Sequence, residues 1–214
     1  MTAAQHARRE RQELAELMLV TGPDAPTLCE GWTTRDLAAH LVVRESRPDA
    51  AAGLVIPPLG PWMERVRRAE ATQPYPEIVR KVRTGPPTLS VFSLPGADSL
   101  GNLIEYVVHH EDVLRAQPDW KVRELPPDLA DELWGRLRQM CRLMYRRMPV
   151  GVTLARTDGS GGSVVAHRGE PMVTLTGTAL ELLMRSYGRR DVHVDVTGDP
   201  AAVEQFESSS ILAV

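Results

Sequence analysis

The residues best suited to chemistry lie between Asp98 and Ala116. Within that stretch, Glu105 and His109 stand four positions apart inside an otherwise apolar helix pattern. At 3.6 residues per turn, both side chains and that of Asp112 fall on one helix face. Neutral imidazole and carboxylate are ordinary zinc donors, and a site with three protein ligands keeps a fourth position open. The spacing therefore indicates part of a divalent-metal site.

A third donor is available from an earlier helix. Thr33 is a suitable cap for a helix that runs to about residue 47, and His40 lies on or near the apolar stripe of that helix. Two core-facing helices would thus supply His40, Glu105 and His109 as candidate metal ligands. Asp112 shares the ligand face and is a candidate to orient a ligand imidazole through its second ring nitrogen; a surface salt bridge is the other reading of this residue.

Other interpretations of these residues stay open. Glu105 and His109 could form an ordinary ion pair on a helix surface, and His40 could be a core histidine bonded to a carbonyl group. All three could also form a buried hydrogen-bond network without a metal. His110 lies about 100° around the helix from His109, so it does not easily share a centre with it.

The sequence offers little for other chemistries. No nucleophile triad and no glycine-rich phosphate loop is recognisable, so no catalytic residue is assigned beyond the metal ligands. His167 and His193 show no ligand-like spacing and are expected to be surface or structural residues. Glu45 and Glu111 are expected to be solvated.

The periodicity of the chain changes at Pro149. Helices are predicted at residues 4–20, 33–47, 61–71, 76–83, 98–116 and 126–148. Strands are predicted at 150–156, 163–168, 172–176 and 191–197, with helical segments at 178–187 and 200–206. The chain is therefore predicted to be an α+β protein, with a helical domain at 1–149 and a small α/β domain at 150–214.

Composition narrows the function classes. The 214 residues are 43% hydrophobic and carry a formal net charge of -3, which gives no electrostatic reason to expect nucleic acid. No apolar segment approaches membrane-spanning length, and the charged N-terminus shows no signal-peptide pattern. Cys29 and Cys141 form no CxxC motif and are expected to be reduced. The expectation is a soluble cytoplasmic protein, monomeric or homodimeric.

Two motifs give the sequence a family resemblance. TRDLAAHL at 34–41 and EYVVHHEDV at 105–113 resemble the DinB-like and mycothiol-dependent maleylpyruvate isomerase superfamily, in particular an actinobacterial metal-binding branch. LCEGW at 28–32 and VTGDP at 196–200 are also similar to that family, so the resemblance covers nearly the whole chain.

The resemblance implies both a fold and a chemistry. It implies an N-terminal DinB-like up-down four-helix bundle that holds a divalent metal, usually zinc, followed by a small α/β domain like that of the isomerase. It implies that His40, Glu105 and His109 hold the metal. Characterised relatives use the metal to activate a low-molecular-weight thiol, often mycothiol, for isomerisation or transfer. Arginines near the site can bind acidic groups, but none is matched here by motif.

Two functions from different classes follow. The first is a thiol-dependent transferase or isomerase that uses Zn²⁺, or another divalent ion such as Ni²⁺, to join a small-molecule thiol to an electrophilic substrate. The second is a non-catalytic, metal-stabilised protein that binds a ligand or a partner. The coordination number separates them, because a fourth protein ligand such as His110 or Asp112 would close the site.

Overall fold

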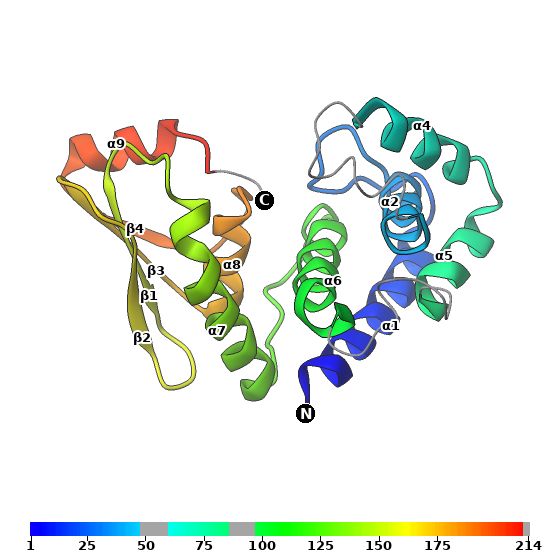
Figure 1. Ribbon diagram of the computed structural model, residues 1–214, viewed down its shortest axis with the longest axis horizontal. Coiled ribbons are helices and arrows are strands. Elements are labelled where there is room, and N and C mark those ends of the chain that lie inside the picture. The colour runs from blue at the N-terminus through cyan, green and yellow to red at the C-terminus, as the bar shows by residue number, and fades with distance from the viewer. Residues whose placement is uncertain (48–59, 86–96, 212–214) are drawn as a thin grey trace. The chain divides into compact units, whose positions relative to one another are not determined.

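The computed structural model describes residues 1–47, 60–85 and 97–211, with side chains omitted at 97–101. These residues form two compact units, 2–122 and 123–214, with Met1 assigned to the second unit. The first is helical, and the second combines helices with a small sheet (Figure 1). The predicted α+β class is therefore confirmed. In the described part of the chain, no helix has the length and apolar character needed to cross a bilayer.

The helical unit contains five described helices: α1 Ala3–Thr21, α2 Thr34–Ser46, α4 Gly60–Ala71, α5 Tyr75–Thr84 and α6 Ala97–Arg115. Helix α1 packs along α6, and α2 contacts both α4 and α5 (Figure 1). Aliphatic side chains at helical spacing fill the space between them and are almost fully buried. This core includes Leu14, Met18, Leu37, Leu41, Ile78 and Tyr106.

Helix α2 begins where the sequence predicted. Thr33 caps it, since its hydroxyl accepts a hydrogen bond from the backbone N of Asp36, and the Asp36 carboxylate accepts one from the backbone N of Thr33 at 3.0 Å. This reciprocal capping box satisfies two backbone donors that would otherwise lack a partner. It fixes the start of α2, and with it the direction of every side chain on that helix.

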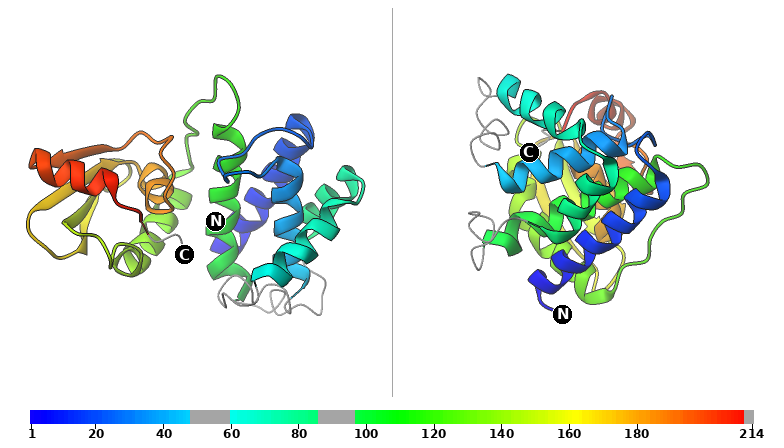
Figure 2. Two further views of the ribbon diagram at one scale, coloured as in Figure 1. Left: turned by 90° about the horizontal axis from the view of Figure 1, so that it is seen from above. Right: turned by 90° about the vertical axis from the view of Figure 1, so that its right-hand side faces the viewer.

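The second unit contains α7 Pro127–Met144, β1 Gly151–Arg156, β2 Gly162–His167, β3 Met172–Gly177, α8 Ala179–Ser186, β4 Asp195–Gly198 and α9 Pro200–Ser208. The strand order is β2-β1-β3-β4, with β1 and β3 parallel and both outer pairs antiparallel. Helices α7 and α8 pack on each other and on the sheet, while α9 lies beside β3 and β4 (Figure 2).

The division between the units precedes α7, whereas the sequence placed it near Pro149. The apolar stripe of α7, which includes Leu133, Leu137 and Met144, is buried, and the helix contacts α8 and β2. A helical repeat of apolar residues indicates that a helix has a buried face, but it does not identify the helix or sheet that packs against that face. The fourth strand is also shorter than predicted, because it begins at Asp195 rather than at residue 191.

Two carboxylates expected in solvent are buried. Glu45 is 3% exposed, and its Oε1 accepts a hydrogen bond from Arg11 at 3.0 Å and another from the Tyr106 hydroxyl. Glu111 has a fully buried side chain, 2.7 Å from Nε of Arg115. Both predictions of a solvated carboxylate were wrong, because each carboxylate has a buried arginine partner that offsets the cost of leaving water.

Candidate metal centre

The three predicted ligands meet between α2 and α6. Nε2 of His40 and Nε2 of His109 each lie 3.2 Å from the same carboxylate oxygen, Oε1 of Glu105. The three donor atoms all lie within 4.8 Å of one another. The two imidazole rings meet edge to face, with centroids 5.5 Å apart. The structure thus brings together the residues that the sequence selected, and their ligation of a metal remains a proposal.

Asp112 occupies the position expected of an orienting residue. Its side chain is fully buried, and Oδ2 lies 2.9 Å from Nδ1 of His109. His109 therefore has a carboxylate at each ring nitrogen, Asp112 at Nδ1 and Glu105 at Nε2. This arrangement fixes the ring and, when Nδ1–H donates to Asp112, directs the lone pair of Nε2 towards Glu105 and His40.

The same contacts set the charges of the group. Burial alone would lower the pKa of His109, but hydrogen bonds with Asp112, Cys29 and Glu105 outweigh it and raise that pKa well above its usual value. Burial opposes ionisation of Glu105, yet hydrogen bonds from His109 and His40 hold its pKa well below the usual range. The centre is therefore built to hold positive charge between two carboxylates.

His40 has a different environment. Burial lowers its pKa, against a smaller opposing effect of the hydrogen bond to Glu105. A neutral imidazole is the form that binds a metal. The surroundings of His40 thus favour its neutral form.

The donor set fits a tetrahedral divalent ion. Ligands about 2.0–2.1 Å from such an ion lie roughly 3.3 Å from each other. The two 3.2 Å separations between the imidazole nitrogens and Glu105 are close to that value. Two imidazoles and one carboxylate are also a common set for a catalytic zinc site, which retains one open position.

Cys29 is a neighbour that the sequence did not assign to the site. Its thiol donates a hydrogen bond to Oδ2 of Asp112 at 3.2 Å, and its sulfur lies 3.9 Å from Nδ1 of His109. The loop that carries it is tied to α6 by a 3.0 Å bond from the backbone N of Leu28 to the carbonyl of Asp112. In the sequence, only the family resemblance of the motif at 28–32 pointed to a role for this segment.

Trp32 covers the other side of the centre. Its ring centroid lies 5.1 Å from that of His40. The guanidinium of Arg67, from α4, lies 4.9 Å from the centroid of Trp32, in a cation–π contact. Arg67 in turn bonds to Asp36 and, through two 2.7 Å bonds, to Glu64. Helix α4, which carries none of the three candidate ligands, therefore helps to hold the Trp32 ring against His40.

Replacing Arg67 by methionine is expected to destabilise the protein by about 1–2 kcal/mol at pH 7. Hydrogen bonds from Arg67 outweigh burial and lower the pKa of Glu64 from 4.5 to about 2. The stability from this contact is complete above pH 4.5 and is lost as the pH falls towards 2. Urea unfolding at several pH values should show the difference shrink in acid. Arg68→Met is the control, because Arg68 bonds the same carboxylate from an exposed position and should change little.

Arg44 is a second residue that motif matching missed. It lies one turn after His40 on α2, and its Nε is 3.4 Å from Oε1 of Glu105. The side chain is 11% exposed and also donates to Oδ1 of Asn102. The i, i+4 spacing from His40 could have revealed it. Arg44 places a cation at the edge of the centre, where an acidic group could approach.

His110 does not join this centre. His110 faces α1, 3.4 Å from Oε2 of Glu10. His167 and His193 belong to the second unit. The prediction that His110 does not share a centre with His109 agrees with this placement.

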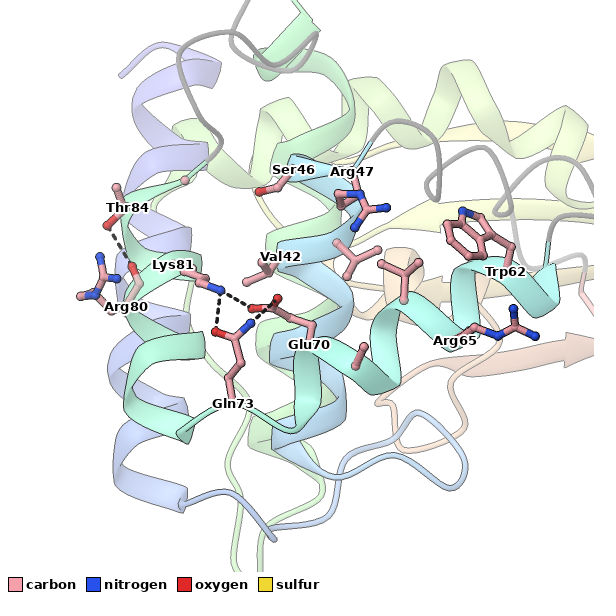
Figure 3. A pocket seen from close by; sticks show the side chains of 14 residues that line it. Val42, Ser46, Arg47, Trp62, Arg65, Glu70, Gln73, Arg80, Lys81 and Thr84 are labelled. Atoms are coloured by element: carbon pink, nitrogen blue, oxygen red, sulfur yellow. Dashed lines mark hydrogen bonds and ion pairs between the residues drawn. The ribbon is translucent and has the colours of Figure 1, made fainter.

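A separate cavity of about 850 Å³ lies between α2, α4 and α5 (Figure 3). Val42 and Ser46 line it from the helix face opposite His40, since they follow it by about 200° and 240° around the helix. Within the described chain, its lining includes none of the three candidate ligands. Lys81 bonds Glu70 and Gln73 at its rim, at 2.7 and 2.8 Å (Figure 3).

The fold and the centre define an α+β protein with a helical unit and a second unit that combines helices with a small sheet. The chain is similar to the crystal structure of the mycothiol-dependent maleylpyruvate isomerase, with a TM-score of 0.54, 15% identity and 91% of each chain covered. A mutant of that enzyme gives a TM-score of 0.52 at 14% identity, again with 91% of each chain covered. No family model and no curated protein matches the sequence. The predicted resemblance is thus confirmed as a likeness of fold.

Proposed function

We propose that this chain binds a divalent metal ion, zinc in the cell, through His40, Glu105 and His109 and uses it to activate a small-molecule thiol. The observation that carries the proposal is the convergence of two imidazole nitrogens on one carboxylate oxygen at 3.2 Å each. The electrostatics support it too, because hydrogen bonds with Asp112, Cys29 and Glu105 outweigh burial and raise the pKa of His109, so its surroundings favour positive charge. A thiol-dependent transfer or isomerisation of an electrophilic substrate is the proposed reaction class.

When bound, the metal would supply Lewis acidity, which favours the thiolate form of a coordinated thiol. The residues of the chain prepare for that chemistry. Asp112 holds the His109 ring by accepting a hydrogen bond at Nδ1. Trp32 lies against His40 and helps to exclude water from one side. Arg44 offers a guanidinium group to an acidic part of the thiol or the substrate.

The thiol class is supported by the fold likeness. Both similar crystal structures are of the mycothiol-dependent maleylpyruvate isomerase and its mutant. Mycothiol is therefore the first thiol to try with this chain. Maleylpyruvate isomerisation itself is not proposed, because no residue of this chain has been matched to recognition of that substrate.

A specific observation favours a second candidate, a non-catalytic metal-stabilised binding protein. Cys29, His109 and Asp112 form another group of donor atoms within 4.8 Å of one another, on the Nδ1 side of the same imidazole. An ion held there would be bound by a thiolate from the chain itself. Such a site would resemble a closed structural zinc site more than an open catalytic one.

Cobalt substitution separates the two candidates. A thiolate ligand gives Co²⁺ a strong near-ultraviolet absorption that imidazole and carboxylate ligands do not give. The catalytic proposal predicts that this absorption is absent from the cobalt protein and appears when mycothiol is added. Cys29→Ser should leave that result unchanged. An absorption present before mycothiol is added, and lost in Cys29→Ser, would support the structural alternative.

Turnover is the second arm of the test. The zinc protein is assayed for thiol consumption with mycothiol and a set of activated alkenes and epoxides, beside the metal-stripped protein. Consumption that requires both zinc and His40 supports the proposal. Equal rates with and without the metal would rule it out.

A further inference from the structure

A second cluster of metal-binding residue types lies on the other side of α6. His110 projects from α6 towards α1, where Glu10 and Glu13 lie three residues apart. One donor atom from each of these three side chains lies within 4.8 Å of the other two. Helices α1 and α6 pack against each other, so the cluster sits in an established helix interface (Figure 1).

Burial makes this cluster unusual. Glu10 is 2% exposed and His110 is 7% exposed. Nδ1 of His110 lies 3.4 Å from Oε2 of Glu10. Among the described residues, that nitrogen has no hydrogen-bond partner. A buried ring nitrogen that makes no hydrogen bond carries the full cost of leaving water.

The chemistry of the three side chains complements a cation. Two carboxylates face one imidazole, so the group has an excess of negative charge when the imidazole is neutral. Arg9 offsets part of it, donating to Glu13 at 2.7 Å, but that pair is on the more exposed side of the cluster. One imidazole nitrogen with carboxylate oxygens is a donor set used by divalent first-row metals such as Zn²⁺ and Mn²⁺.

We propose that Glu10, Glu13 and His110 form a second divalent-metal site, held between α1 and α6 and distinct from the centre at His40, Glu105 and His109. A bound ion would give Nδ1 of His110 the partner that the protein residues do not supply. It would also lie against the buried carboxylate of Glu10. This site does not depend on the proposed thiol chemistry.

Metal counting tests the proposal directly. The metal-stripped full chain, without a histidine tag, is titrated with Zn²⁺ by calorimetry, and bound metal is confirmed by elemental analysis. The wild type is expected to bind two equivalents. His110→Ala and Glu10→Gln should each bind one, and Glu13→Gln should bind the second equivalent about tenfold more weakly. Glu16→Gln is the matched control, since this α1 carboxylate pairs with Arg83 at the surface and should leave both equivalents.

The outcomes separate this site from the first centre. If His109→Ala loses one equivalent and the double variant His109→Ala with His110→Ala loses both, two independent sites are established. If the wild type binds one equivalent that His110→Ala retains, the second site does not exist and Glu10 and His110 form only an ion pair. If one equivalent is lost in His110→Ala but kept in His109→Ala, the second site stands and the proposed function falls.

Unfolding of a variant would mimic loss of metal. His110→Gln keeps a polar side chain of similar reach, and Glu13 is only half-buried, so both substitutions should fold. If these variants still bind one equivalent at the centre of His40, Glu105 and His109, helix α6 is intact. Binding of both equivalents with wild-type affinity in folded His110→Gln and Glu13→Gln would overturn the proposal.

Discussion

Replacing His109 by alanine is expected to abolish metal binding at the centre between α2 and α6. The substitution removes one of three donors and also leaves Asp112 buried with no imidazole to accept from. The loss of affinity should exceed the roughly 10- to 100-fold typical when only an orienting residue is removed. Competition with a chromophoric zinc chelator measures it. His40→Ala should have a comparable effect, since it removes a donor from the opposite helix.

Two controls define what the result means. Asp112→Asn keeps all three donors but weakens the hold on His109, so affinity should fall by only about 10- to 100-fold. His167→Ala makes the same substitution at a half-buried histidine on β2 and should leave zinc affinity unchanged. An unchanged affinity in both His109→Ala and His40→Ala would show that the three side chains form a hydrogen-bond network and not a metal site.

Breaking the ion pair inside α6 is expected to produce the largest loss of stability. Glu111 and Arg115 are one turn apart, with both side chains fully buried and 2.7 Å between them. Removing one member of a buried ion pair typically costs about 3–5 kcal/mol. Arg115 also lies 4.7 Å from the ring centroid of Trp120, so Arg115→Met loses a cation–π contact as well. Urea unfolding of Glu111→Gln and Arg115→Met at pH 7 measures both effects.

The double variant is the informative comparison. When Glu111→Gln and Arg115→Met are combined, both charges of the pair are removed together, so the double variant should be more stable than the sum of the two single losses predicts. A loss below about 1 kcal/mol in each single variant would be the value of a surface pair, and would contradict the buried pairing.

The candidate ligands could be predicted from the sequence because their direction depends on residue spacing within single helices. The four-residue spacing of Glu105 and His109 places both on one face of any helix, whatever surrounds it. The cap at Thr33 and the apolar stripe of α2 likewise fixed the direction of His40. Spacing within each helix could not show that the two helices pack together. The resemblance of the two motifs to one family indicated that packing.

Some of the differences between prediction and structure concern partners that are distant in sequence. Glu45 was predicted to be solvated, but it is buried. Its partners are Arg11 of α1 and Tyr106 of α6, which only the packed helices bring together. The division between the compact units also lies at a different place from the predicted boundary near Pro149. The apolar stripe of α7 predicted a buried helix, but its amphipathic pattern fits the sheet as well as it fits a helical bundle.

The position of Trp32 gives the protein an intrinsic optical reporter. Indole fluorescence responds to charge and to paramagnetic or heavy ions within a few ångströms, and this ring lies 5.1 Å from His40. Co²⁺, Ni²⁺ or Cu²⁺ at the α2–α6 centre would quench its emission, whereas Zn²⁺ would shift it. Trp32→Phe would remove that response and leave the emission of Trp62, Trp120 and Trp134 as the background. Occupancy of the centre can therefore be followed in real time, without an added dye.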